Sequence, residues 1–403
     1  MDAIKYIEML HDKHFFDLKK MEYKYSKEAV EEMLGLLKLS AYKQIPLKDF
    51  SAEKNLVYID SLLSDTSEAT KALLSYRGSA SYGLHSLEDE IVSTLMIEQI
   101  DTSRESVRKI LAGSAPKDEF EHRIWGMKQG FEFISAHDNQ INAENFRTLY
   151  EIMINPYLKD PEDRLSDEQL YRTGDVYVTN QTRGVTVHKG IAPVKIDAAM
   201  NQLFAFIEQN GSMDDLLKAA VLHFYVSYLH PYYDGNGRMA RMLHLWFLLQ
   251  KGYSSALFMP FSSLIQKNKN QYYKAFDDVE SNISVSGVLD VTPFLKYFND
   301  NVYRHIGEQR LESDALEQFT ELLRNGNITE KEKDLFQFVL SKYGNGEFST
   351  KQLERDFGHC AYATIRGFVL KLTQFGVLEA HHYGSRTKYC IAPPNTSSSK
   401  ASR

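Results

Sequence analysis

The stretch that decides the fold is His230-Pro231-Tyr232-Tyr233-Asp234-Gly235-Asn236-Gly237-Arg238-Met239-Ala240-Arg241. Apolar residues recur at helical spacing before it, over 216–229, and after it, over 238–250. We therefore expect a short loop that joins two helices. The loop combines an imidazole, a carboxylate, a Gly-Asn-Gly turn and two guanidinium groups.

These residue types suit the binding of phosphate. Gly235 and Gly237 allow a tight turn that brings backbone N–H groups toward an anion, and the following helix adds the positive end of its dipole. Arg238 and Arg241 lie one helical turn apart, so both guanidinium groups can grip phosphate oxygens. Asp234 is placed to hold Mg²⁺ on the same phosphates.

His230 is the candidate general base, because an ordinary imidazole is often neutral near pH 7 and can accept a hydroxyl proton. Taken singly, His230 and Asp234 can also be helix caps, and the arginines can form surface salt bridges. Together, they favour a functional site. The loop is neither a Walker loop nor a Rossmann fingerprint, and His230 with Asp234 alone makes a weak zinc site.

The loop resembles the Fic signature, His-Pro-Phe-x-Asp-Gly-Asn-Gly-Arg-x-x-Arg, with Tyr232 in the place of Phe. The extra hydroxyl of Tyr232 needs a partner and should tune the loop without disabling it. The resemblance implies a mainly α fold, a helical bundle with a β-hairpin flap. It also implies a Mg²⁺-dependent nucleotidyltransferase, a protein adenylyltransferase that moves AMP from ATP to a protein hydroxyl.

The resemblance also assigns roles within the loop. His230 would deprotonate the target hydroxyl for an in-line displacement at the α-phosphorus, and Asp234 would bind Mg²⁺. The backbone turn would hold the α- and β-phosphates and the guanidinium groups would steady the leaving pyrophosphate; the nucleotide contacts are thus Gly235, Asn236, Gly237, Arg238 and Arg241. No covalent enzyme intermediate is required.

Two segments that precede the loop also resemble parts of Fic proteins. The alternating residues over 174–190 predict a hairpin that resembles the Fic flap, which would hold the target protein as a paired strand; a plain structural hairpin is the alternative. Residues 93–98 resemble the inhibitory motif, with Thr94 and Glu98 in its key positions, although Gln99 replaces the usual Gly or Asn. Glu98 would pair with Arg241 and block the γ-phosphate, unless it is only an exposed glutamate on an amphipathic helix.

Downstream, Tyr272 and Tyr273 resemble the tyrosines that line the adenine pocket in many relatives, while Glu280 stands where some have Asn. Aromatic residues at helical spacing are equally often core residues. Preference for ATP over other nucleotides is therefore left open.

The C-terminal part has the pattern of a winged helix-turn-helix. We expect helices over 330–342, 350–357 and 361–375, then a strand, a turn and a strand over 377–391. Basic residues of the third helix and the wing that could contact DNA are Arg366, Lys371, His381, His382, Arg386 and Lys388. Residues 329–393 carry nine basic and seven acidic side chains, so docking to a protein is favoured over contact with DNA.

The chain divides into five predicted parts: an N-terminal helical segment with the inhibitory helix (1–110), a Fic catalytic domain (111–319), a linker (320–328), the winged helix (329–393) and a disordered tail (394–403). The net charge of −7 argues against a chain that coats nucleic acid or anionic membrane along its whole surface. The lack of a signal peptide or a long apolar span indicates a cytoplasmic protein. The two cysteines, Cys360 and Cys390, give neither a disulfide framework nor a zinc motif.

Three functions remain open on the sequence. The favoured one is an adenylyltransferase that Glu98 inhibits and that has a protein substrate, with self-modification and a homodimer both allowed. The second is a DNA-binding transcriptional regulator whose Fic domain senses a nucleotide. The third is a deAMPylase, in which Glu98 would orient a water molecule.

Overall fold

The computed structural model describes residues 2–50, 53–63, 70–71, 74, 82–136, 138–180, 185–209, 211, 213–308, 319, 321–343, 346–358, 360–384 and 386–392. Within these residues the protein is mainly helical, and its sheets are three separate antiparallel pairs of strands. The mainly α fold class is confirmed. No helix of the described part is long and apolar enough to cross a membrane.

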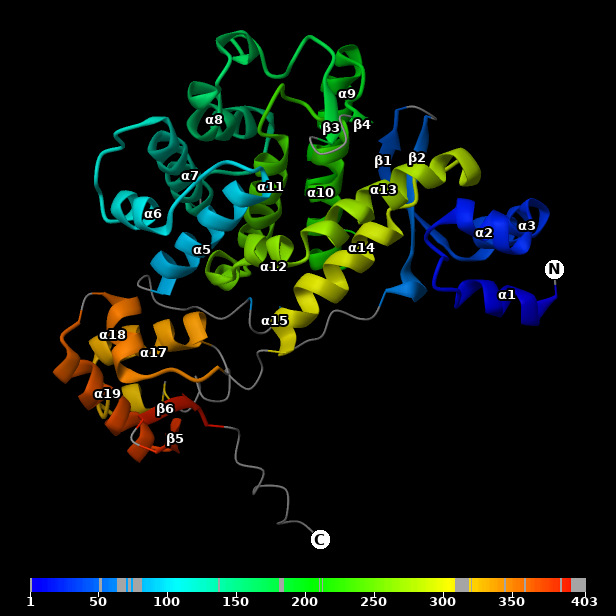
Figure 1. Ribbon diagram of the computed structural model, residues 1–403. Helices are drawn as coiled ribbons and strands as arrows, with labels where there is room; N and C mark the ends of the chain where they lie inside the picture. Colours follow the sequence, from blue (N-terminus) through cyan, green and yellow to red (C-terminus); the bar gives the residue numbers. More distant parts are fainter. Residues whose placement is uncertain are drawn as a thin grey trace.

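Two packed helices, α10 (Asp215–Leu229) and α11 (Asn236–Gln250), lie at the centre of the catalytic part (Figure 1). Nearly all their side chains are buried, which explains why they read as apolar around most of their circumference. Asp214 caps α10 by accepting the N–H of Leu216 at 2.9 Å. The loop from His230 to Gly235 joins the two helices, as predicted.

Further helices surround this pair and share one hydrophobic core with it. They are α6 (Arg104–Leu111), α7 (Glu119–Ser135), α8 (Ala143–Met153), α9 (Pro193–Glu208), α12 (Phe261–Lys267), α13 (Lys269–Ser286) and α14 (Thr292–Phe298). The helix that carries the predicted inhibitory motif, α5 (Tyr82–Ile97), packs against α11 and α12. After α14, a π-helical turn (Asn299–Tyr303) leads into α15 (Arg304–Glu308).

The N-terminal segment is not wholly helical, contrary to the prediction. It begins with α1 (Ala3–Leu10), α2 (Leu18–Tyr25) and α3 (Lys27–Ser40), and continues into a hairpin of β1 (Tyr42–Asp49) and β2 (Lys54–Ile59). Ile45 and Leu47 are buried on alternate positions of β1. The N–H of Val57 donates to the Leu289 carbonyl at 3.0 Å, so the hairpin is fastened to the catalytic core after α13.

The predicted flap is a hairpin of β3 (Tyr177–Asn180) and β4 (Val185–Lys189), which pair antiparallel from Tyr177 opposite Lys189. Its turn, 181–184, lies outside the described residues. The hairpin stands between α8 and α9 in the chain and ends beside the loop at His230, because the N–H of Ile191 donates to the Leu229 carbonyl at 3.3 Å.

The C-terminal part has a hydrophobic core of its own. Its elements are α17 (Glu330–Tyr343), α18 (Thr350–Phe357), α19 (Tyr362–Gln374), β5 (Leu378–Tyr383) and β6 (Arg386–Ile391), the predicted order. Ser349 caps α18 by accepting the N–H of Gln352 at 3.2 Å. Figure 1 shows this part below the catalytic core, and α17 contacts α5.

The predicted linker at 320–328 needs a correction. Residues 321–324 are helical, and Phe319 and Ile328 are buried in the C-terminal core, so these residues belong to the C-terminal part. The polar residues Asn325 to Asn327 form the turn within the predicted linker. The predicted disordered tail, 394–403, lies outside the described residues.

Candidate functional site

His230 terminates α10 in a left-handed backbone conformation, with φ 49° and ψ 62°. Its Nδ1 lies 2.5 Å from the Ser227 carbonyl oxygen. A carbonyl only accepts, so Nδ1 carries the hydrogen and Nε2 keeps a free lone pair. Burial, helped by the neighbouring His188, lowers the pKa of His230 to about 4. The imidazole is therefore neutral at physiological pH, as a general base must be.

Arg172 fixes this loop, and the sequence did not single it out. It is 2% exposed, and its guanidinium donates at 2.6 Å to each of three carbonyl oxygens, those of His230, Gly174 and Ile191. It thereby connects the His230 loop to both ends of the flap. A buried arginine that satisfies backbone carbonyls has no sequence signal, since any arginine reads as a surface residue.

His188, on β4, is a second imidazole beside the candidate base, with its ring centroid 5.5 Å from that of His230. Its Nδ1 lies 2.8 Å from the Glu280 carboxylate, and its Nε2 lies 2.8 Å from the Tyr228 carbonyl oxygen. Glu280 therefore fastens the flap to α13. The resemblance to the family had instead associated Glu280 with the adenine pocket.

The Gly-Asn-Gly turn has a close-packed backbone. Gly235 has φ +79°, and a Cβ there would lie 2.5 Å from Ile154, so only glycine fits. The Asn236 side chain braces the loop, since it accepts the Tyr232 N–H at 2.9 Å and donates to the Tyr232 carbonyl at 2.8 Å. Its backbone N–H lies at the N-terminus of α11, where N–H groups lack partners within the helix.

Arg238 and Arg241 bring two buried guanidinium groups to this turn, each with a side chain only 4% exposed. Among the described residues, Nε of Arg238 and Nη1 of Arg241 have no hydrogen-bond partner. Buried, unpaired donors on a cation are costly unless a ligand satisfies them. The pair is thus suited to an anion with several oxygen atoms.

Asp234 stands at the open edge of the same turn. Its side chain is 63% exposed, and Arg238 Nη2 is 3.5 Å from Oδ2, a loose contact. Oδ1 accepts the N–H of Gly235 at 2.5 Å, which holds the carboxylate in place. Oδ2 therefore remains accessible, and an exposed carboxylate oxygen beside a phosphate cradle is a donor that Mg²⁺ accepts.

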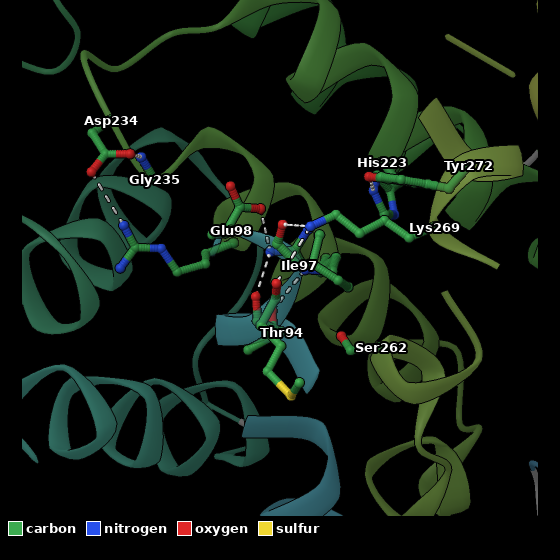
Figure 2. A network of polar contacts seen from close by, with 12 residues as sticks. Thr94, Ile97, Glu98, His223, Asp234, Gly235, Ser262, Lys269 and Tyr272 are labelled. Carbon is green, nitrogen blue, oxygen red and sulfur yellow. Dashed lines mark hydrogen bonds and ion pairs between the residues drawn. The ribbon is translucent and has the colours of Figure 1, made fainter. Parts of the chain in front are cut away.

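Thr94 and Glu98 lie against the other arginine (Figure 2). Arg241 donates from Nη2 to the Glu98 carboxylate at 2.6 Å and from Nε to the Thr94 hydroxyl at 2.7 Å. Burial opposes ionisation of Glu98, but Arg241 outweighs it and lowers the pKa of this carboxyl. A Cβ at Gly237 would lie 2.4 Å from Glu98 Oε1, so the carboxylate sits directly over the turn.

Lys269 and Glu90 hold α5 in this position, and neither stood out in the sequence. Lys269 Nζ donates to the Ile97 carbonyl at 2.7 Å, at the C-terminal end of α5, as Figure 2 shows. Glu90 accepts the N–H of Ser262 at 2.8 Å and also its hydroxyl proton, so it caps the first turn of α12. Burial raises the pKa of Glu90 to about 7.

The structure separates the two predicted adenine-pocket tyrosines. Tyr273 is 43% exposed, and its hydroxyl donates to the Ile97 carbonyl at 3.4 Å, so it lies beside the inhibitory motif. Tyr272 is 3% exposed, and its hydroxyl is 2.8 Å from His223 Nε2 in the core. Of the two, only Tyr273 offers a surface on which a base can stack.

Tyr232 is fully buried and stacks on Tyr150, with ring centroids 3.6 Å apart. Its hydroxyl has no hydrogen-bond partner among the described residues, so the partner expected for it is not found there. The ring therefore stabilises the loop by packing alone.

Several basic residues of the C-terminal part are paired within it. Lys371 lies 2.9 Å from Glu332, and both His381 and Lys388 contact Glu347, at 2.7 and 3.2 Å. Arg366 and Arg386 remain exposed. Internal pairing reduces the positive charge available for DNA phosphates.

Known proteins resemble this chain most clearly over the same region. The family described as Fic/DOC matches residues 140–248. The "Protein adenylyltransferase fic-1" of Caenorhabditis elegans is 26% identical over 154 residues, 36% of this chain and 26% of the relative. The "Protein adenylyltransferase Fic" of Culex quinquefasciatus is 26% identical over 182 residues, 45% of this chain and 32% of the relative.

The matches thus span a quarter to a third of these curated relatives. A crystal structure of a Fic family protein from Desulfovibrio desulfuricans G20 is 17% identical and covers 81% of this chain and 90% of that one, with a TM-score of 0.48. The family match covers the whole loop from His230 to Arg241 and the helices on both sides of it. Residues 140–248 of this chain are thus a domain that matches the Fic/DOC family.

Proposed function

We propose that the protein is a Mg²⁺-dependent protein adenylyltransferase that transfers AMP from ATP to a protein hydroxyl and is inhibited by Glu98. The observation that carries the proposal is the pair of buried arginines, Arg238 and Arg241, with donors that no described residue satisfies. They adjoin a helix N-terminus and a neutral imidazole with a free Nε2. Phosphate and an attacking hydroxyl together satisfy such a site.

In this reaction the target hydroxyl oxygen bonds to the α-phosphorus of ATP, and the bond from that phosphorus to the β-phosphate oxygen breaks. His230 Nε2 takes the hydroxyl proton, and pyrophosphate leaves. The amides of Gly235, Asn236 and Gly237 hold the phosphates. Asp234 would hold Mg²⁺, which when bound neutralises charge on the phosphates.

Inhibition follows from the position of Glu98. The Glu98 carboxylate accepts a hydrogen bond from the Arg241 guanidinium at 2.6 Å. A phosphate oxygen would have to displace this carboxylate to bind the same nitrogen. The same carboxylate adds negative charge directly over the turn at Gly237, which repels a triphosphate. Thr94 holds the Arg241 side chain in the orientation that favours this pair.

The target protein would bind along the flap. Within the described residues, β3 and β4 pair with each other and with no third strand, so the outer edge of either strand could pair with a strand of the target. Arg172 attaches the base of the flap to the His230 loop, which would place a paired hydroxyl side chain near Nε2.

The test is transfer of label from [α-³²P]ATP with Mg²⁺ to the protein itself and to lysate proteins. Glu98→Gly should label strongly, the wild type weakly, and Glu98→Gly with His230→Ala not at all. Gln99→Gly is the matched control, because Gln99 is adjacent to Glu98 and its φ of 59° already suits glycine.

An unchanged level of labelling in Glu98→Gly, with ATP still bound, would refute the inhibitory role. ATP binding without labelling in any variant would instead identify a nucleotide sensor. Loss of AMP from a premodified protein, dependent on Glu98, would identify the reverse reaction.

A further inference from the structure

The outer face of the C-terminal hairpin gathers three potential metal ligands. Glu379 and Cys390 are paired across β5 and β6, and His381 lies two residues further along the same face. The opposite face, with Leu378, Ala380 and their partners, packs on the core of the C-terminal part. Strand pairing thus brings together residues whose sequence spacing matches no zinc motif.

The three side chains enclose a small space. His381 Nε2 lies 3.7 Å from Glu379 Oε1 and 4.0 Å from Cys390 Sγ, and all three ligand atoms lie within 4.8 Å of one another. A tetrahedral Zn²⁺ holds nitrogen, oxygen and sulfur ligands roughly 3.3–3.6 Å apart, given bonds of about 2.0–2.3 Å. Two of the three separations are thus within about half an ångström of this geometry.

A second carboxylate orients the imidazole. His381 Nδ1 lies 2.7 Å from Glu347 Oε1, so Nδ1–H donates to this acceptor and the Nε2 lone pair faces Cys390 and Glu379. Zinc-bound histidines commonly donate their other N–H to a carboxylate in this way. Lys388 and Tyr383 also contact Glu347, at 3.2 and 2.7 Å, which keeps the carboxylate in place.

Two simpler explanations account for less of the arrangement. An ion pair explains His381 with Glu347, but at 3.7 Å Nε2 is too far from Glu379 for a hydrogen bond. A lone reactive cysteine is no better an explanation, because it leaves the orientation of His381 by Glu347 unexplained. Neither explains why a soft sulfur, a nitrogen and an oxygen converge.

We propose that Glu379, His381 and Cys390 bind one Zn²⁺ ion, with Glu347 as the residue that positions His381 and with a fourth coordination position open to water. The mixed N, O and S ligands suit Zn²⁺ over Mg²⁺ or Ca²⁺. The ion joins β5 to β6 and, through Glu347, to the segment before α18. This site is independent of the proposed transfer reaction at His230.

The test uses the full chain without an affinity tag, stripped with a chelator and titrated with Co²⁺. We expect one Co²⁺ per chain with a thiolate-to-cobalt charge-transfer band in the near ultraviolet, and Zn²⁺ should abolish the band. Cys390→Ser should remove the band, whereas Cys360→Ser, the matched control, should keep it. Co²⁺ bound at Asp234 has only oxygen ligands and gives no such band.

Glu347→Gln should weaken Co²⁺ binding about tenfold, as loss of an outer partner does. Glu379→Gln replaces a side chain that is 52% exposed, so it tests the site even if Cys390→Ser misfolds, and should weaken binding at least about tenfold. No charge-transfer band at saturating Co²⁺, a band that survives Cys390→Ser, or unchanged affinity in Glu379→Gln would each overturn the proposal.

Discussion

The two arginines of the Fic loop lie three residues apart on α11, yet they have opposite surroundings. In the first turn of α11, the polar contact of Arg238 among the described residues is a loose one of 3.5 Å, with an exposed Asp234. By contrast, Arg241 is held by Glu98 and Thr94 at 2.6 and 2.7 Å. The guanidinium group is therefore available to a ligand at Arg238, whereas at Arg241 it is held by Glu98 and Thr94.

This difference separates two properties of the site: whether its groups are already in position, and whether a phosphate can reach them. We call Arg238, Asp234 and His230 the open end of the site. Ser227 and Arg172 orient His230, so this end would need no rearrangement to accept a phosphate and a hydroxyl. The closed end requires α5 or the Glu98 side chain to move. In the proposed mechanism, inhibition would act on one contact and leave the rest of the site assembled, so changes at the two ends should have different effects.

The largest effect is expected from removing the base at the open end. In the Glu98→Gly background, His230→Ala should reduce the rate of AMP transfer by about 100- to 10,000-fold, the usual contribution of general base catalysis. ATP affinity, measured by calorimetry, should change little. Retained transfer in this double variant would mean that another group accepts the proton.

Arg172→Ala should break the support of the open end. It leaves three buried carbonyl oxygens without their 2.6 Å donors, so the free energy of unfolding should fall by about 4 kcal/mol. Denaturant titration measures the loss. Arg172→Lys keeps one charged donor and should lose less; equal stability in all three proteins would contradict the assigned role.

Glu90→Gln tests the attachment of α5 at the closed end through pH. The folded-state pKa of Glu90 is raised to about 7, so its stabilising effect is complete below the unfolded value near 4.5 and is lost as pH rises through 7. Between these limits the wild type should lose roughly 3 kcal/mol of unfolding free energy relative to Glu90→Gln. If plots of unfolding free energy against pH run parallel for the wild type and Glu90→Gln, Glu90 is not the source of this pH dependence.

The smallest effect is expected from Thr94→Val. It removes the 2.7 Å hydrogen bond to Arg241 but keeps Glu98, which should weaken the closed arrangement by about 1.5 kcal/mol and raise labelling about tenfold at most. Thr94→Ser keeps the hydroxyl and serves as the control. Activation as large as that of Glu98→Gly would mean that Thr94 has a further role.

Local sequence patterns predicted much of the fold. The apolar periodicity of α10 and α11 and the alternation in the flap each depend on neighbours in the chain, and each was read correctly. The hairpin of β1 and β2 was missed because Pro46 and the charged residues around it obscure the alternation of Ile45 and Leu47. Its partner, the segment at Leu289, is distant in sequence.

The candidate site shows the same limit. Its loop residues share one short motif and were named together, whereas Arg172, His188 and Lys269 contribute through contacts that only the folded chain creates. Tyr272 and Tyr273 are adjacent in sequence but face the core and the surface respectively. The side on which each residue of a helix lies depends on what packs against it.

The left-handed backbone of His230 has a consequence for stability. A helix terminus with φ near 49° is best occupied by glycine or asparagine, and another residue there costs on the order of 1 kcal/mol. Glycine at this position should therefore raise the stability of the fold. It would also remove the imidazole that the proposed reaction needs, so stability and the proposed chemistry would favour different residues here.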